Sequence, residues 1–282
     1  MQIKNIVFLF GSFIILASCQ KEFQVDNTNY KPKLVLNNLF QQNAPFEVVV
    51  SKSTNVYDTI LPSYLSTATV KLYVNGAYTE TLTSIGQGKY NATTLPTAGN
   101  TYKISVSNAG FDDAVAENKM PNPVKISNWA YIDSTFKDSN GDYFGDLSFT
   151  IDDPMEENNY LLSFQFWDVV TQSYLYLSLF ESADQSLNQN LAKRLQNGEY
   201  LFTDNLFNGK KKNILLKIPS GYYDSTPNYL LKLYSLSKAA YFYAYTKPET
   251  IGNALNNTPI YSNVTNGLGI FAGRSLDVDT IR

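Results

Sequence analysis

Apolar and polar side chains alternate with a period of two residues along most of the chain beyond residue 31. The pattern is clearest at residues 68–74 and 101–107, where every second side chain is apolar. This period is typical of β-strands with one face on a core, and Gly, Pro or Asn separates such segments at intervals of about ten residues. Asn75-Gly76 tolerates the positive φ angles of a tight hairpin turn. The strands predicted in the first half are 33–39, 46–51, 68–74, 78–82, 88–92 and 101–107.

The second half continues the β pattern and also contains two segments that favour helices. Leu187, Leu191 and Leu195 recur at every fourth position, which predicts a short amphipathic helix over residues 182–196. Ser237 can cap a helix over residues 238–245 that ends at Lys247-Pro248, although the composition of this segment also suits a strand. The strands predicted here are 124–132, 146–152, 159–167, 213–218 and 229–235.

These elements predict a mainly β protein in two domains. At roughly 100–200 residues per domain, the 282 residues are enough for two cores. Met120-Pro121-Asn122-Pro123 marks the boundary, because two prolines lack N–H donors and favour an extended joint. The strand spacing before it predicts an immunoglobulin-like β-sandwich over residues 32–120. Residues 124–282 are predicted to form a second, β-rich domain with one or two short helices.

The N-terminus carries a short apolar segment behind a basic residue. Lys4 precedes an apolar run over residues 6–17, which is about a dozen residues long, whereas a membrane-spanning helix needs about twenty. We therefore interpret residues 1–18 as a signal peptide. Leu16-Ala17-Ser18-Cys19 closes the run and resembles the bacterial lipobox. That resemblance implies cleavage before Cys19 and acylation of the new N-terminus. The alternative is an ordinary signal peptide that is cut further along.

The residues after Cys19 indicate a destination. Gln20-Lys21-Glu22 resembles the export signal of lipoproteins in the Bacteroidota, which sends them to the outer face of the outer membrane. The match is partial, because one acidic residue follows Lys21 directly and the next, Asp26, comes later. A solvated linker is the alternative. Residues 19–31 are predicted to be a lipidated tether, and two or three acyl chains would hold it durably, because each buried methylene contributes about 0.8 kcal/mol.

The composition removes several classes of chemistry. The chain has no His and a single Cys, so Ser-His-Asp or Cys-His catalysis, His-ligated metal sites and intrachain disulfides are excluded. With 22 Lys+Arg against 25 Asp+Glu and no basic stripe, the sequence does not predict nucleic-acid binding. A glycosidase would need carboxylates such as Asp152 and Glu157 to face a cleft.

We expect the carboxylates of the 153–158 turn to be solvated. We also expect that the protein is not an enzyme.

One loop has the oxygen-bearing side chains of a metal site. Asp138, Asn140 and Asp142 supply oxygens at alternate positions and Asp146 adds a fourth, as the oxygen ligand sphere of calcium requires. Phe149 stands where an EF-hand loop has its bidentate Glu, and the glycine of such a loop is displaced. An Asx-rich hairpin turn accounts for the same residues without a metal. Apart from this calcium hypothesis, no cofactor is predicted.

Tyrosine is abundant, with 21 residues in the chain. Its amphipathic ring suits both a strand and a recognition surface. The densest aromatic clusters are 174–176, 222–223 and 241–245. These clusters predict a surface groove that binds sugars or peptides. The simpler alternative is that their rings only cover the β core.

A glycine-rich segment near the C-terminus has a predicted backbone role. Asn266-Gly267-Leu268-Gly269 suits a chain that needs positive φ angles or approaches another strand closely. It lacks the strand and helix context of a phosphate-binding loop, so nucleotide binding is not predicted.

Three segments of the second half resemble the recurring signatures of a lipoprotein family of the Bacteroidota. They are residues 152–160, 202–210 and 259–273. The family is catalogued as domain of unknown function 4249, and the strands at 33–39 and 101–106 fit its N-terminal half. Members are commonly encoded beside TonB-dependent outer-membrane receptors, and no catalytic residues are established for them. The resemblance thus implies a lipid-anchored partner of a receptor barrel.

We therefore expect a surface-exposed outer-membrane lipoprotein that serves as a non-catalytic accessory or ligand-binding component of a TonB-dependent transporter. An envelope adhesin or scaffold needs the same anchor and the same β body, and it is the alternative. A hydrolase that works without His is the weaker alternative. The sequence does not identify the ligand or the residues that contact it.

Overall fold

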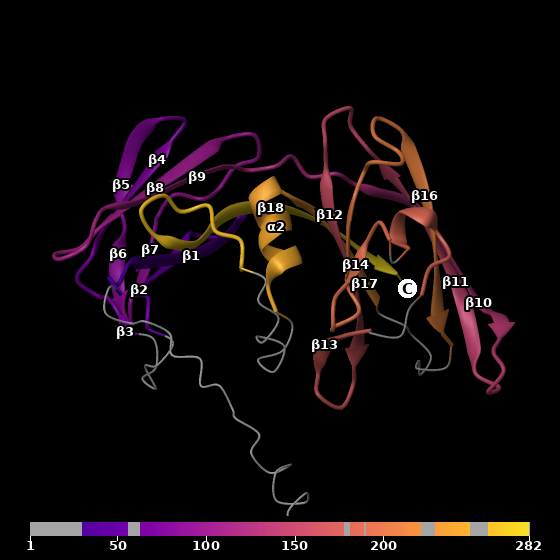
Figure 1. The fold of residues 1–282 in the computed structure, drawn as a ribbon. Coiled ribbons are helices and arrows are strands. Elements are labelled where there is room, and N and C mark those ends of the chain that lie inside the picture. Colours follow the sequence, from indigo (N-terminus) through magenta and orange to yellow (C-terminus); the bar gives the residue numbers. More distant parts are fainter. Residues whose placement is uncertain are drawn as a thin grey trace, which may run out of the picture. The chain divides into compact units, whose positions relative to one another are not determined.

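Strands account for most of the residues that the structure describes. The computed structural model describes residues 30–55, 63–177, 181–188, 190–220, 229–248 and 259–281. The chain divides into two units, Met1–Lys31 and Pro32–Arg282, and every element below lies in the second. The predicted fold class, mainly β with a short helix in the second half, is confirmed (Figure 1).

The main sheet contains strands from both halves of the chain. Its order is β14 (Lys193–Arg194), β15 (Tyr200–Thr203), β12 (Asn159–Asp168), β17 (Tyr229–Leu236), β18 (Leu268–Ile281), β1 (Leu34–Gln41), β2 (Glu47–Lys52), β7 (Lys89–Asn91) and β6 (Thr83–Gly86). Two further strands pair off this path, β13 (Ser173–Tyr176) with β12 and β3 (Ser63–Tyr64) with β2.

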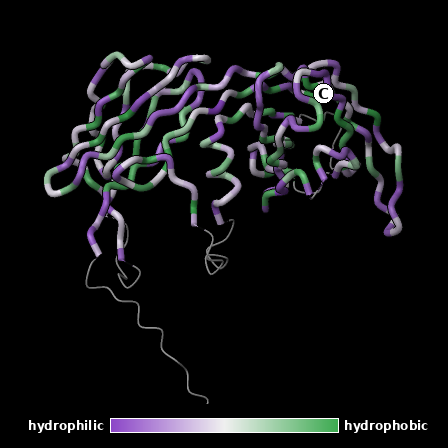
Figure 2. The backbone as a smooth tube through the Cα atoms, turned by 45° about the horizontal axis from the view of Figure 1, so that its top comes forward, coloured by the Kyte–Doolittle hydropathy of each residue, from purple (hydrophilic) through white to green (hydrophobic). Residues whose placement is uncertain are grey.

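Two smaller sheets accompany the main sheet. The four-stranded sheet has the order β5 (Ala77–Thr81), β4 (Thr69–Val74), β8 (Thr101–Ser107) and β9 (Ala114–Lys119). The three-stranded sheet has the order β10 (Ile126–Lys137), β11 (Tyr143–Asp152) and β16 (Lys211–Pro219). Hydrophobic and hydrophilic residues alternate along many of these strands (Figure 2), as expected for strands with one face on a core.

β18 joins the two halves of the main sheet. Its first half pairs in parallel with β1, from Leu268 opposite Val35 to Arg274 opposite Gln41. Its second half pairs antiparallel with β17, from Arg274 opposite Leu236 to Ile281 opposite Tyr229. This 14-residue strand therefore connects the N-terminal strands to the C-terminal strands in one hydrogen-bonded ladder (Figure 1).

The glycine-rich segment at the start of β18 allows β1 to approach closely, which confirms its predicted backbone role. Gly269 has a φ of +109°, and a Cβ there would lie 2.0 Å from the Leu36 carbonyl oxygen. A Cβ at Gly267 would lie 2.8 Å from the Leu34 carbonyl oxygen. Side chains at these two positions would therefore push β1 and β18 apart.

The first hydrophobic core is built from the β1, β2 and β7 part of the main sheet and from β4, β8 and β9. An aromatic group occupies it, in which the Phe40 ring centroid lies 5.1 Å from that of Phe46, 5.4 Å from that of Tyr102 and 4.8 Å from that of Phe271. Phe271 comes from β18, so a residue near the C-terminus completes a core of N-terminal strands.

The second core is built from the three-stranded sheet and from β12, β15 and β17 of the main sheet. Phe164 and Tyr229 stack in it with ring centroids 4.8 Å apart. A third, smaller cluster places Ala239 and Ala240 of the helix against Ile270 and Ala272 of β18. The cores thus bury side chains from strands far apart in the sequence.

The segment at the predicted domain boundary runs from one core to the other. Met120 is buried in the first core and Val124 in the second. Phe271 of the predicted second domain nevertheless belongs to the first core. The division into domains at residues 32–120 and 124–282 stays a prediction.

One predicted helix is confirmed and the other is wrong. Helix α2 spans Lys238–Thr246, and the Ser237 hydroxyl accepts a hydrogen bond from the Ala240 N–H at 3.2 Å as its N-cap. The described residues of the 182–196 segment form only the 3₁₀ turn η1 (Gln185–Leu187) and β14. The Asp184 carboxylate accepts a hydrogen bond from the Ser186 N–H at 2.8 Å, and such short polar side chains compete with helical backbone bonds.

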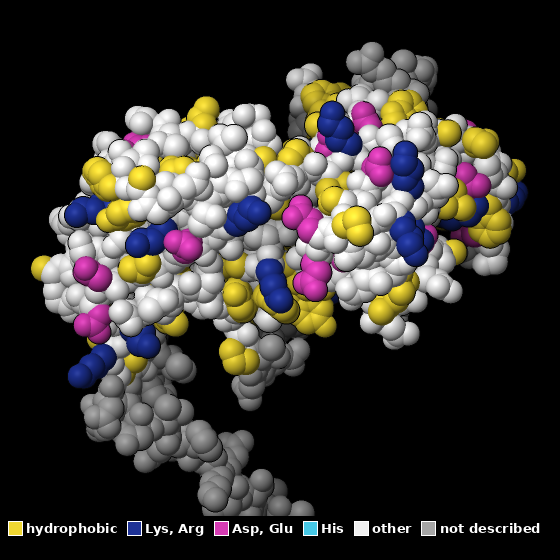
Figure 3. All heavy atoms as spheres, turned by 90° about the horizontal axis from the view of Figure 1, so that it is seen from above, with side chains coloured by type: hydrophobic (Ala, Val, Ile, Leu, Met, Phe, Trp, Pro, Cys, Tyr) yellow, Lys and Arg dark blue, Asp and Glu magenta, His cyan; other side chains and the backbone are white. Residues whose placement is uncertain are grey.

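The described surface mixes side chains of both charge signs with hydrophobic ones. On the face shown in Figure 3, Lys and Arg side chains lie among Asp and Glu side chains. Among the described residues, no helix has the length and apolar composition needed to cross a membrane.

The close approach of β18 to β1 predicts that Gly269→Ala is strongly destabilising. We expect a loss of about 3 kcal/mol of unfolding free energy, because the added methyl both meets the Leu36 carbonyl and takes a strained φ angle. Urea unfolding followed by circular dichroism measures the loss. Gly110→Ala is the matched control, because Gly110 has a φ of +86° with no atom within 4 Å of the added Cβ. Equal losses in the two variants would contradict the account.

Candidate functional site

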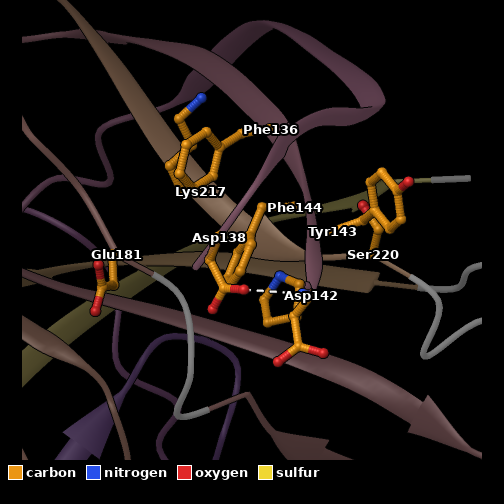
Figure 4. A pocket seen from close by; sticks show the side chains of 9 residues that line it. Phe136, Asp138, Asp142, Tyr143, Phe144, Glu181, Lys217 and Ser220 are labelled. Atoms are coloured by element: carbon orange, nitrogen blue, oxygen red, sulfur yellow. Dashed lines mark hydrogen bonds between the residues drawn. The ribbon is translucent and has the colours of Figure 1, made fainter. Parts of the chain in front are cut away.

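A pocket of about 530 Å³ lies where the β10–β11 hairpin meets the end of β16. Figure 4 shows the side chains around it. The residues that line it are Phe136, Asp138, Asp142, Tyr143, Phe144, Glu181, Lys217, Pro219 and Ser220. They combine three aromatic rings with three carboxylates and one ammonium group.

The aromatic side of the pocket is built by strand register. Phe136 of β10 stands opposite Phe144 of β11, and their ring centroids lie 6.3 Å apart. The Lys217 ammonium lies 5.9 Å from the Phe136 ring centroid and forms an ion pair with Asp146. Because Asp146 balances the charge of Lys217, the remaining carboxylates leave the pocket acidic.

The acidic side of the pocket is the turn between β10 and β11. One Asp138 carboxylate oxygen accepts hydrogen bonds from the backbone N–H groups of Asn140 at 2.9 Å and Asp142 at 2.8 Å. Gly141 takes a φ of +94° between them. This is the Asx-rich hairpin turn that the sequence offered as the alternative to a calcium loop.

The four residues of the calcium hypothesis do not share one site. Asp138, Asn140 and Asp142 lie in the turn, whereas Asp146 lies on β11 and pairs with Lys217. Within the described ranges, no group of three or more His, Cys, Asp or Glu side chains is placed to hold a metal ion. Calcium binding stays a prediction, and the backbone hydrogen bonds already account for the position of Asp138.

Alternation along the strands does not identify this pocket. In the sequence pattern, ordinary surface positions of a strand or loop are predicted for Phe136, Lys217 and Glu181. The irregularity that places Phe136 is a register shift in β10 between Ile132 and Phe136, where Ser134 has a φ of 53°. Glu181 joins by backbone pairing with Lys217, in which the two residues exchange N–H to carbonyl bonds of 2.9 and 2.7 Å.

A second group of carboxylates lies in two of the signature segments. Asp153 is only 5% exposed, and it accepts hydrogen bonds from the Tyr160 hydroxyl and, at 2.9 Å, from the Gly209 N–H. Asp204 is 2% exposed and accepts a hydrogen bond from the Asn158 N–H at 2.8 Å. These contacts fasten the turn before β12 to the loop after β15.

The burial of Asp153 corrects the expectation that the carboxylates of this turn are solvated. Glu156 and Glu157 are exposed as expected, but Asp153 provides the acceptor that the buried Tyr160 hydroxyl needs and also accepts from the Gly209 N–H. Burial raises the pKa of both Asp153 and Asp204. Repulsion from Asp204 raises the pKa of Asp153 further, and repulsion from Glu157 raises that of Asp204. Both acids hold main-chain N–H groups in place, which is a structural task.

The other predicted site residues lie elsewhere. The lipobox residues Leu16, Ala17, Ser18 and Cys19, and the export signal Gln20, Lys21 and Glu22, lie outside the described residues. So does the 222–223 tyrosine pair. Tyr174 and Tyr176 are exposed on β13, while Tyr90, Tyr102, Tyr160 and Tyr229 are fully buried in the cores. Four tyrosines therefore cover the β cores, and a recognition role for the exposed ones stays a prediction.

Comparison with known proteins identifies the family of this β-sheet protein. The chain belongs to the family described as domain of unknown function DUF4249, whose model matches residues 20–277. No curated protein matches the chain.

Among solved structures, the chain is similar to a Corynebacterium diphtheriae protein that is described as membrane anchored. The sequences are 7% identical and the TM-score is 0.23. The similarity covers 73% of this chain and 54% of that one, so the chain spans about half the length of that structure.

The raised pKa of Asp204 predicts a pH-dependent stability. The folded state holds the Asp204 proton more tightly than the unfolded chain does. The stabilisation that this proton gives is therefore fully present below the ordinary pKa of 3.8, and it is lost as the pH rises through the raised pKa of the folded state. Asp204→Asn mimics the protonated acid, and its amide oxygen can still accept the Asn158 N–H. We expect the variant to gain stability relative to the wild type as the pH rises above 3.8 in urea unfolding.

The control for this comparison is Asp113→Asn, which removes an exposed carboxylate. A stability difference between Asp204→Asn and the wild type that does not change with pH would contradict the raised pKa.

Proposed function

We propose that this chain is a lipoprotein, held by acyl chains on Cys19 at the outer face of the outer membrane. It serves there as a non-catalytic accessory or ligand-binding component of a TonB-dependent transporter. The observation that carries the proposal is the position of the single Cys directly after the apolar run, in Leu16-Ala17-Ser18-Cys19. The family match, which begins at residue 20, is consistent with a mature body that starts there.

The pocket at the β10–β11 hairpin supports a binding role for the body. Its carboxylates can accept hydrogen bonds from hydroxyl or amino groups, and its rings offer apolar and cation-binding faces. Two of its charged groups already have partners within the protein. Asp138 accepts hydrogen bonds from backbone N–H groups, and Lys217 forms an ion pair with Asp146. Such a pocket suits a ligand held without covalent chemistry.

The transporter role predicts a receptor barrel as a stable partner. Purification of the lipoprotein from outer membrane solubilised in mild detergent is expected to recover a TonB-dependent receptor in stoichiometric amount. Size-exclusion chromatography and mass spectrometry of the complex measure this. Recovery of the free lipoprotein alone would contradict the transporter role and would favour the adhesin or scaffold alternative.

The export signal predicts exposure on the cell surface. Protease added to intact cells is expected to degrade the wild-type chain, and the variant with Lys21→Ala and Glu22→Ala should be protected because its export signal is removed. Lys31→Ala is the matched control, because it removes a positive charge at the other end of the tether. Equal degradation of the double variant and the wild type would show that these two residues do not direct export.

A further inference from the structure

The hairpin of β12 and β13 extends beyond the strands that flank it. β17 pairs with β12 from Asn159 to Phe166 and β15 pairs with it only as far as Leu162. From Trp167 onward β12 pairs with β13 alone, with Trp167 opposite Tyr174 and Asp168 opposite Ser173. The hairpin end therefore projects from the main sheet (Figure 1).

The end of this hairpin exposes two valines beside the polar residues Thr171 and Gln172. Val169 is 71% exposed and Val170 is 87% exposed in the turn. Directly behind them the exposed rings of Trp167 and Tyr174 meet edge to face, with centroids 5.1 Å apart. Two adjacent aliphatic side chains thus stand in front of an aromatic pair.

The hairpin end carries almost no charge. Asp168 is the single charged residue between positions 166 and 177. Its carboxylate accepts hydrogen bonds from the Thr171 N–H at 2.6 Å and from the Thr171 hydroxyl at 2.8 Å, so it serves the turn. A salt-bridged protein interface would need more charge than this surface offers.

The order of residues along the hairpin matches the layers of a membrane interface. Aliphatic side chains gain most in hydrocarbon, whereas the amphipathic rings of Trp and Tyr prefer the level of the headgroups. Large apolar groups exposed together in this way mark a contact with a partner or a membrane. The aliphatic tip, the aromatic pair behind it and the low charge favour the membrane.

The predicted tether allows this contact. Residues 19–31 are thirteen residues, which span at most about 45 Å when extended. β18 has 14 residues and is also about 45 Å long. Val35 of β1 pairs with its first residue, whereas Tyr229, which pairs with Phe166 of β12, lies opposite its last residue. An anchor on Cys19 therefore does not prevent the hairpin from reaching the same bilayer.

We propose that the β12–β13 hairpin inserts Val169 and Val170 into the interface of the bilayer that holds the lipid anchor, with Trp167 and Tyr174 at the level of the headgroups. This contact rests in part on the proposed lipid anchor. It gives the body a second point of attachment and so fixes its orientation relative to the membrane.

Tryptophan fluorescence tests the insertion directly. The chain has two Trp, so Trp129→Phe leaves Trp167 as the single reporter. The purified full-length lipoprotein with this change is placed in phosphatidylcholine vesicles, with and without bromine-labelled acyl chains. We expect Trp167 emission to shift to shorter wavelength and to lose intensity in the brominated vesicles. Adding Val169→Asp and Val170→Asp should abolish both effects.

The matched control is Ile85→Asp in the same background, because Ile85 is an exposed aliphatic residue of β6. It should leave the Trp167 shift and quenching unchanged. Thermal unfolding in detergent checks that each variant folds, and the quenching of unaltered Trp167 decides the question even if the double variant does not fold.

Two results would overturn the insertion. One is Trp167 emission that is the same in brominated and plain vesicles. The other is shielding of Trp167 from a water-soluble quencher only when a receptor barrel is present, which would assign the hairpin to a protein interface. Failure of the anchor is distinguishable from both, because it appears as a mature chain whose mass lacks acyl groups.

Discussion

The pairing of β18 with both β1 and β17 is the interaction on which the rest of the structure depends. It connects the N-terminal and C-terminal strands in one sheet and brings Phe271 into the first core. The parallel half of this pairing needs glycine at position 269, where the Leu36 carbonyl fills the space of a side chain. Because β1 and β18 lie at opposite ends of the folded unit's sequence, the N-terminal core is complete only when β18 has paired with β1. Long-range contacts of this kind generally slow folding.

Local patterns predict the strands that have one buried face. β1, β4 and β8 alternate in burial along most of their length, and the alternation of their sequences predicts them. β18 escapes this rule because four consecutive residues, Ile270–Gly273, are buried between neighbours on both sides. The leucine spacing at 182–196 suggests one buried helical face, but the leucines do not share a face. Leu187 is buried in the second core, whereas Leu191 is exposed.

The candidate site divides in the same way. The Asp138 turn follows from local chemistry, because its partners Asn140 and Asp142 are neighbours in sequence. The ion pair of Lys217 with Asp146 spans 71 residues, and the bond from the Gly209 N–H to Asp153 spans 56, so only the strand registers bring them together. Composition and periodicity predict neither contact. The exposed hairpin of Trp167 and Val170 is equally hidden, because exposure depends on where the flanking strands end.

The protein is a β-sheet body of the DUF4249 family with an aromatic and acidic pocket, and we propose that it is held at a membrane through Cys19. The proposed location of the protein, and in part the membrane contact of the β12–β13 hairpin, depend on that attachment. The most direct test is the intact mass of the mature chain purified from membranes, with tandem mass spectrometry of its N-terminal peptide. We expect an N-terminus at Cys19 that carries two or three acyl chains. A mature chain that begins at another residue, or a Cys19 without acyl groups, would contradict it.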